Sequence, residues 1–495
     1  MFTIGLDAGN LMLLLSILVF VAVLSNKIGT RFGVPSMLVF LIVGMVAGQD
    51  GIGLKFDNLH LAEFMCHLGM TVILLTGGLE TEMHETRPVL RQGILLSTLG
   101  VLITIGLTGA FIYLVAGKTI GPEGTTLLGA LLVAAVLAST DSTSVFNILR
   151  SKRLQLRENL GPMLELESGS NDPMAYVCTI ILVKLVNGGL EVEAGGQMAG
   201  ATAFMVALVL VYQVAIGLVV GYLVGRFSKW VLGRINLNSS PLVSIMILSL
   251  AFFSNGIASL VGGNGLLALY VSAIMIGNAP TLPQKKEVLK FFDGISWLSQ
   301  LLMVLMLGLL AHPSQMPRVL VPALLIGLFM MLVARPAAVF ISLIGFRKLP
   351  VRAKLFTSWV GIKGAGPILF ALYTVVHEVG GSDIIFNIVL VITLLSLLTQ
   401  GMTLPLVARW LNLSIDEDPQ VETFGLDLPE EMGMMRDHIV APEDLQRGET
   451  LRDLHLPHGI RVIMVKRREK FIVPHGSLKL EPEDHLLILM GDTED

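Results

Sequence analysis

Six ionisable side chains interrupt long apolar segments of this 495-residue chain, and they mark the places where chemistry is possible. A charged group at the centre of a membrane-spanning helix costs on the order of 2.5 to 3.5 kcal/mol, so each one needs a functional or structural reason. Three of them fall close together in the sequence, between positions 165 and 172. The six are Asp141, Glu165, Glu167, Asp172, Arg335 and Lys363.

Oxygen-bearing side chains form a stripe on one predicted helix. Helical spacing places Glu167 and Asn171 on one face, with Ser168 and Asp172 on the adjoining face. Oxygen ligands suit hard monovalent or divalent cations, whereas zinc or copper would favour His and Cys. The sequence therefore predicts a site for a hard cation and a proton, centred on Asp172. The predicted binding residues are Asp172, Ser168, Glu167, Asn171, Thr140 and Asp141, the last two from a neighbouring broken helix.

The chemistry expected of Asp172 is competition between two ligands. A buried carboxylate without a fixed cationic partner relieves its charge by taking up either a proton or a metal cation. Competition at one site, combined with an inward-open and an outward-open state, is sufficient for antiport. The alternative is that Asp172 is a satisfied carboxylate of the protein core.

The other charges are expected to pair. Arg335 is the expected partner of Glu167, because a guanidinium that binds a carboxylate bidentately keeps both charges stable in a medium of low dielectric constant. Asp141 and Lys363 lie in two different interrupted helices, where an acid and a base compensate the dipoles of the half-helices. The alternative for Asp141 is that it only caps a half-helix. Glu165 is left without a role.

Composition and charge distribution indicate a membrane domain followed by a soluble one. The chain is 53% hydrophobic and 15% charged, with a mean hydropathy of +0.76, whereas soluble domains carry about 25% charge. From Trp410 onward the chain holds 28 of its 72 charges. A net charge of −4 without a basic face argues against nucleic-acid binding. We predict a transmembrane domain over 1–409, a linker over 410–429 and a small cytoplasmic α+β domain over 430–495.

Thirteen apolar runs have the length of membrane-spanning helices, so the predicted fold class is an all-α polytopic membrane domain. Nineteen Lys and Arg lie in the loops on one side and four on the other, which places the N-terminus outside and the C-terminus in the cytoplasm. The predicted spans are near 9–26, 35–49, 61–79, 93–116, 123–149, 159–186, 197–225, 238–260, 264–280, 291–311, 318–346, 353–377 and 384–408.

An odd number of spans permits an inverted repeat, in which six helices, one linker helix and six further helices follow one another. Under this division the fifth and twelfth spans correspond, and both are interrupted, at Ser139–Ser144 and Gly361–Pro367. Paired interruptions of this kind indicate the binding site of a transporter. The alternative is that Gly and Pro simply allow close packing of membrane helices.

Short motifs surround these polar positions, namely Ser139-Thr-Asp141, Glu167-Ser-Gly-Ser-Asn-Asp-Pro173, Ala334-Arg-Pro336 and Gly361-Ile-Lys-Gly364. Together they resemble the monovalent cation:proton antiporter-1 family. The tail, with Gly448-Glu-Thr-Leu-Arg-Asp-Leu454 and Pro474-His-Gly476, resembles a TrkA-C (RCK-C) regulatory domain. The combination is similar to the NhaP-type potassium/proton antiporters of the cell volume regulation type.

The resemblance implies an NhaA-like antiporter fold with two broken crossing helices. It also implies a homodimer in membrane lipid, in which spans 4 to 6 and 11 to 13 move against a dimer domain. Asp172 would carry both ions, helped by Ser168, Glu167 and the Thr140 backbone. No cofactor is implied, and a nucleotide or an ion is the candidate regulator of the tail.

The implied activity is exchange of cytoplasmic K⁺, or alternatively Na⁺, for H⁺, in cation, pH and cell-volume homeostasis. Asn171 beside a single titrating carboxylate resembles the electroneutral group of the family. Ser142 and Lys363 depart from the family pattern, since many relatives have Pro and Arg there. These two departures leave the shape of the helix crossing open.

Two other classes compete with an antiporter. A cation channel regulated by an RCK-like domain would need a carbonyl-lined filter such as Thr-Val-Gly-Tyr-Gly, which the sequence lacks. A membrane-embedded enzyme would need metal ligands or a nucleophile with its base inside the spans. We therefore predict a secondary transporter and not an enzyme.

Overall fold

The computed structural model divides into two compact units, Met1–Ile415 and Asp416–Asp495. Most of the predicted linker, residues 417–429, lies outside the residues that the structure describes. Those residues are 8–31, 34–54, 58–116, 126–152, 154–188, 198–235, 239–280, 282, 284–416, 435–440, 448, 450–454, 460–467, 470–482 and 484–490.

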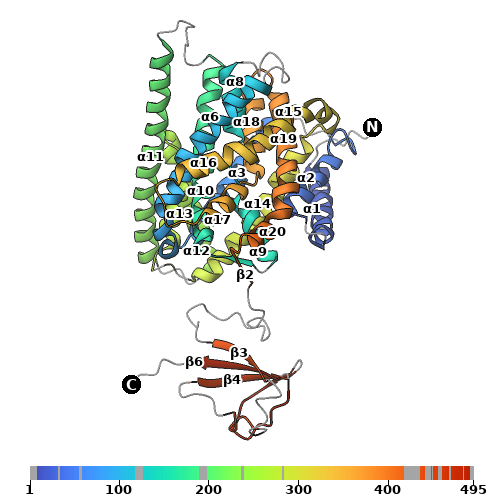
Figure 1. Ribbon diagram of the computed structural model, residues 1–495, viewed down its shortest axis with the longest axis vertical. Helices are drawn as coiled ribbons and strands as arrows, with labels where there is room; N and C mark the ends of the chain where they lie inside the picture. Colours follow the sequence, from blue (N-terminus) through green and yellow to red (C-terminus); the bar gives the residue numbers. More distant parts are fainter. Residues whose placement is uncertain are drawn as a thin grey trace. The chain divides into compact units, whose positions relative to one another are not determined.

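The first unit is almost entirely helical (Figure 1). It begins with α1 (Ala8–Arg31), α2 (Ser36–Ala47) and α3 (Leu59–Glu80). A nearly continuous helical run then extends from Met83 to Ala116, with short 3₁₀ and π segments inside it. This run consists of α4 (Met83–Thr86), η1 (Arg87–Val89), α5 (Leu90–Leu95), η2 (Leu96–Gly100), α6 (Val101–Phe111) and η3 (Ile112–Ala116).

Two helices are broken in the middle of this unit. The first consists of α8 (Leu127–Val136) and α9 (Ser142–Ser151), and the second of α17 (Val351–Trp359) and α18 (Ala365–Val376). Each break falls where hydroxyl residues or glycines make continuous helix unfavourable. Figure 1 shows α8 and α18 toward one end of the helical unit and α9 and α17 toward the other.

Long helices complete the unit. Seven helical runs of the described part are long and apolar enough to cross a membrane, and each overlaps a predicted span. The other predicted spans fall on shorter or more polar helices of the described part, such as α2 (12 residues) and the acidic α10, so the count of thirteen crossings stays a prediction. The remaining helices are α10 (Leu160–Val186), α11 (Met198–Arg234), α12 (Ser240–Leu260), α13 (Gly265–Gly277), α14 (Lys285–Leu309), η5 (Pro313–Gln315), α15 (Met316–Phe329), η6 (Met330–Ala334), α16 (Arg335–Ser342), α19 (Ser382–Ser396), η7 (Leu397–Gly401) and α20 (Met402–Trp410).

The α11 helix lies along one edge of the unit, where it packs on α13 (Figure 1). Gly217, Gly221 and Gly225 repeat every four residues on the face that meets α13. A Cβ atom at Gly221 would lie 2.6 Å from the carbonyl oxygen of Ala268, so only glycine permits this approach. Small residues at this spacing are how membrane helices pack closely.

The second unit contains an antiparallel four-stranded sheet with the order β3-β6-β4-β5. Its strands are β3 (Met435–Ile439), β4 (Ile460–Arg467), β5 (Lys470–Ile472) and β6 (His485–Met490). Val465, Leu486 and Ile488 alternate toward a small apolar core. Within the described part of this unit only strands and turns occur, so the helix expected for an α+β domain is not seen there. In the first unit, β1 (Leu154–Leu156) pairs with β2 (Ser414–Asp416).

Candidate functional site

The two broken helices cross at their interruptions and bond to each other there. The backbone N–H of Asp141 donates to the carbonyl oxygen of Ile362 at 2.9 Å. Gly364 lies two residues further along the chain, and a Cβ atom built on it would lie 2.1 Å from Asp141 Oδ2. Any side chain at position 364 would therefore displace the Asp141 carboxylate, which explains why glycine occupies this point of the crossing.

Opposite charges lie at the ends of the half-helices. Asp141 caps the N-terminus of α9, because its carboxylate accepts from the Ser144 backbone N–H at 3.1 Å and from the Ser144 hydroxyl at 2.7 Å. Lys363 Nζ donates to the carbonyl oxygen of Ser139 at 2.8 Å, just beyond the end of α8. Both arrangements match the sign of the adjacent helix dipole. Lys363 is 3% exposed, so its charge is held inside the protein.

The polar stripe of α10 packs against the break between α8 and α9. The Ser168 hydroxyl donates to the carbonyl oxygen of Thr140 at 2.7 Å, and Asn171 Nδ2 donates to the Thr140 hydroxyl. Asp172 Oδ1 accepts a hydrogen bond from the Ser139 hydroxyl. Residues of α10 thus hold the unwound backbone in place, and that backbone supplies a donor to Asp172.

Glu167, the remaining acid of the α10 stripe, contacts Arg335 instead of the broken helix. Arg335 Nη2 donates to Glu167 Oε1, and the two residues are 5% and 1% exposed. Arg335 opens α16 directly after the π-helical turn η6, a type of helix irregularity that often marks functional positions. The contact leaves both charges compensated inside the protein.

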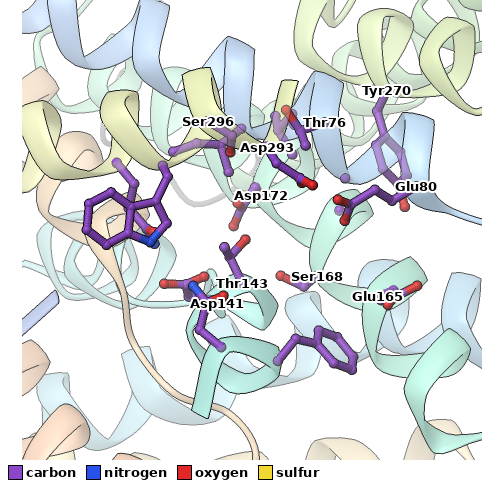
Figure 2. Close-up of a pocket in the computed structure, with 18 residues that line it drawn as sticks. Thr76, Glu80, Asp141, Thr143, Glu165, Ser168, Asp172, Tyr270, Asp293 and Ser296 are labelled. Atoms are coloured by element: carbon purple, nitrogen blue, oxygen red, sulfur yellow. The ribbon is translucent and has the colours of Figure 1, made fainter. Parts of the chain in front are cut away.

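A cavity of about 240 Å³ reaches Asp172 (Figure 2). Its wall includes three residues of the predicted set, Asp141, Ser168 and Asp172. Figure 2 shows their side chains around one space, to which α3, α10, α13 and α14 also contribute. Further polar residues of the wall are Thr76, Glu80, Thr143, Asn147, Glu165, Tyr270, Asp293, Ser296 and Gln300.

The structure separates the predicted binding residues into two groups. Asp141, Ser168 and Asp172 line the cavity, whereas Glu167, Asn171 and Thr140 do not. Glu167 contacts Arg335, and Asn171 and Thr140 bond to each other. These three residues contact the helices that form the cavity wall but do not line the cavity themselves.

Sequence reasoning left several wall residues without a role. Glu80, Tyr270 and Asp293 lie at the ends or in the middle of other helices, and no local motif links them to Asp172. Glu165 is seven residues from Asp172, about two helical turns along α10, so its place in the same cavity follows from helical spacing. Ser139 belongs to the motif already recognised, but only the tertiary structure shows its hydroxyl donating to Asp172.

Comparison with known families explains this arrangement. The profile described as "Sodium/hydrogen exchanger, transmembrane" matches residues 15–410. The chain belongs to the sodium/hydrogen exchanger family. A second profile, the TrkA-C domain, matches residues 438–493.

Curated relatives resemble this exchanger over most of its length. The K(+)/H(+) antiporter NhaP of Alkalimonas amylolytica is 34% identical, and the match covers 99% of this chain and 83% of the relative. The K(+)/H(+) antiporter NhaP2 of Shewanella baltica (strain OS223) is 33% identical, over 96% of this chain and 80% of the relative. By family and by relatives, this exchanger is a cation/proton antiporter, which is a secondary transporter and not an enzyme.

A solved structure shares the helical fold of this exchanger. The sodium proton antiporter MjNhaP1 from Methanocaldococcus jannaschii, determined at pH 8, superimposes with a TM-score of 0.66. The match covers 79% of this chain and 98% of that chain, with 22% identity. The likeness supports the antiporter fold.

Proposed function

We propose that the protein exchanges K⁺, or alternatively Na⁺, for H⁺ by competition of the two ions at Asp172. The observation that carries the proposal is the different surroundings of two acids on α10. Glu167 contacts Arg335, whereas Asp172 forms no ion pair within the described part of the chain and lines the cavity. A carboxylate that lines an internal cavity without an ion-pair partner takes up whichever mobile cation reaches it.

The hydrogen bonds at Asp172 suit two alternative occupants. With a bound cation, the carboxylate remains an acceptor for the Ser139 hydroxyl, and Ser168 lines the same cavity. With a bound proton, the acid itself becomes a donor, and no metal ion is needed to balance its charge. Either a bound cation or a bound proton neutralises the charge of Asp172, and the two ions cannot bind at the same time.

The neighbouring side chains support the proposal of a one-for-one exchange. Asn171 is neutral and donates to Thr140, and Lys363 stays fixed to the Ser139 carbonyl oxygen. Asp172 is then the one group whose charge changes during the cycle. We propose that exchange is electroneutral for this reason.

The preference for K⁺ is supported by the curated relatives, which are named K(+)/H(+) antiporters. MjNhaP1, which shares the fold, is named a sodium proton antiporter, so Na⁺ is the alternative. Selectivity between the two ions depends on cavity size and on the number of ligands. A cation channel under the control of the TrkA-C domain is the alternative from another class.

Alternating access requires two sets of helices that move against each other. We assign spans 4 to 6 and 11 to 13, which are α4–α10 and α15–α20, to the moving core set. The scaffold set then consists of α1–α3 and α11–α14, and we propose that it carries the homodimer contact. Thirteen crossings with inverted repeats and two broken helices complete this proposal, in agreement with the α8–α9 and α17–α18 breaks.

We propose that the cavity opens toward the cytoplasmic side of a bacterial inner membrane. Glu80 ends α3, Glu165 lies near the start of α10 and Asp293 near the start of α14. Close to those helix ends lie Arg87, Lys285 and other cations on the side of the membrane that carries more Lys and Arg. The same rule places the N-terminus outside and the TrkA-C unit in the cytoplasm.

The domain limits remain those of the sequence analysis, with a membrane domain over 1–409, a linker over 410–429 and a regulatory domain over 430–495. The TrkA-C profile over 438–493 supports a regulatory role for the tail. We propose a nucleotide or an ion as its effector, and a role of the exchanger in cation, pH and cell-volume homeostasis.

Proteoliposomes that contain a pH dye test this function. Adding K⁺ or Na⁺ outside should alkalinise the lumen of the wild-type vesicles, because protons leave as the cation enters. Asp172→Asn should abolish the signal, since an amide neither titrates nor balances a cation. Glu378→Gln makes the same chemical change at an exposed residue beyond the end of α18 and should transport normally. K⁺ flux without proton movement would support the channel instead.

A further inference from the structure

On the proposed cytoplasmic side of Asp172 lies a cavity, whereas aromatic rings occupy the proposed outer side. The cavity that contains Glu80 and Asp293 reaches Asp172 from the proposed cytoplasmic side. Tyr176 lies four residues further along α10, on the same helix face and one turn toward the proposed outer side. Tyr176 is therefore the next residue on the outward side of Asp172 along this helix face.

Aromatic rings fill the space around Tyr176. The centroid of its ring lies 5.5 Å from that of Phe370 and 5.9 Å from that of Tyr373, both on α18. Tyr373 stacks in turn on His377 at 3.9 Å. All four side chains belong to the core set, so they move together when that set moves.

One further ring meets Tyr176 from the scaffold set. His67 on α3 lies 5.7 Å from Tyr176 between ring centroids. Among the aromatic contacts of the described residues, this is the one that joins the two sets, since the others lie within the core set or within the scaffold set. A pair of aromatic rings thus connects the core set and the scaffold set one helical turn from Asp172.

The neighbouring turn of α3 extends the same contact. Met70 follows His67 by three residues, on the same face of the helix, and is 3% exposed. A Cβ atom built on Gly366 would lie 3.8 Å from the Met70 methyl carbon and 3.7 Å from Asp172 Oδ1. The α3 face that carries His67 and Met70 therefore covers the α10 face that carries Asp172 and Tyr176.

We propose that Tyr176 closes the outer path to Asp172 by packing on His67, and that separation of these two rings admits ions from outside. The inference rests on the proposed antiport function. Coupled exchange requires that Asp172 never faces both sides at once. The Tyr176–His67 contact supplies that condition in this state, so Tyr176 is a coupling residue rather than a ligand of the ion.

Removal of the Tyr176 ring should uncouple the transporter. In Tyr176→Ala proteoliposomes that contain a permeant anion to balance charge but no exchangeable cation, an imposed pH gradient should dissipate, whereas wild-type vesicles under the same conditions should hold it. Tyr176→Phe keeps the ring and should stay coupled. Phe111→Ala is the matched control, because it removes another stacked ring, packed 4.0 Å from Phe329 within the core set. His67→Ala removes the other half of the contact and replaces Tyr176→Ala if that variant does not fold.

A labelling experiment tests the path without relying on transport. A Met70→Cys reporter should react faster with an impermeant thiol reagent added outside when Tyr176→Ala is also present, and not when Phe111→Ala is present. Both native cysteines, Cys66 and Cys178, are buried, which allows this comparison. Equal labelling rates in these pairs, or a gradient held by Tyr176→Ala, would overturn the proposal. Absence of exchange in the wild type would instead refute the proposed function, and the labelling result would still decide the closure.

Discussion

Arg335 and Glu167 illustrate how a buried charge pair can stabilise the helices next to the proposed transport site. Both are buried, so removal of one partner leaves the other charge uncompensated in a medium of low dielectric constant. Breaking a buried pair in this way costs about 3 to 5 kcal/mol. Arg335→Ala should therefore lower the apparent unfolding temperature in detergent strongly.

The double variant Arg335→Met with Glu167→Gln separates charge balance from packing. It removes both charges and keeps similar volumes, so it should recover much of the stability lost in Arg335→Ala. If the double variant is no more stable than Arg335→Ala, the pair is not the source of the stability.

Asp484 in the second unit gives a prediction on pH. Burial alone would raise the pKa of this carboxyl, but the hydrogen bonds from Arg467 and from the Glu481 backbone N–H outweigh burial and hold its pKa below the ordinary 3.8. The stabilisation is therefore fully present above that ordinary value and is lost as the pH falls through the lower folded value. The hydrogen-exchange protection factors of the β4 and β6 strands in the full chain should fall over this acidic interval.

The matched variant is Asp484→Asn, which removes the charge at every pH. Its exchange in the same strands should be faster than that of the wild type at pH 7, and the difference should shrink in acid. A constant difference down to strongly acidic pH would show that Arg467 and Asp484 do not contribute through their charges.

At the scale of elements, the crossing of the two broken helices depends on the absence of a side chain at position 364. Gly364→Ala would bring a methyl group to within 2.1 Å of Asp141 Oδ2, so the crossing must shift. We expect reduced exchange in the proteoliposome assay together with reduced thermal stability. Gly106→Ala in α6 is the control, because a Cβ atom there meets no atom within 4 Å and alanine favours helix. Normal exchange by Gly364→Ala would show that the crossing tolerates rearrangement.

The breaks were predictable from sequence because their residue types are poor in helix. Ser139–Ser144 and Gly361–Pro367 combine hydroxyl residues, glycine and proline, and the helices end at or beside these stretches. What could not be predicted is which distant groups bond there. The Asp141 N–H finds the Ile362 carbonyl more than two hundred residues away, and that choice depends on how whole helices pack.

The candidate binding site could likewise be predicted from the sequence only in part. The stripe on α10 was predictable from helical spacing, but spacing does not tell which members of a stripe face a cavity. Asn171 donates to Thr140, and the cavity wall is completed by Glu80 and Asp293 from α3 and α14. Tyr176 and His67 carry no motif at all, so their contact could only be found in three dimensions.

At the scale of the whole molecule, the two compact units divide the work expected of a regulated exchanger. The residues that contact Asp172 all belong to the first unit, and the second unit has its own sheet and apolar core. The proposed exchange chemistry therefore belongs to the first unit, and a regulatory TrkA-C unit would act on it by favouring one of its conformations.

Charge balance over the full cycle gives the last prediction. If Asp172 returns carrying one proton for each monovalent cation that it carries the other way, no net charge crosses the membrane. One uncompensated charge would respond to voltage by about 2.3 kcal/mol per 100 mV, so even a modest potential would change the rate severalfold. We expect the same exchange rate in vesicles with and without an imposed potential, measured with the internal pH dye at matched ion gradients. A rate that follows the potential would mean that a second charge moves with Asp172, and Lys363, fixed in this state to the Ser139 carbonyl oxygen, would be the first group to examine.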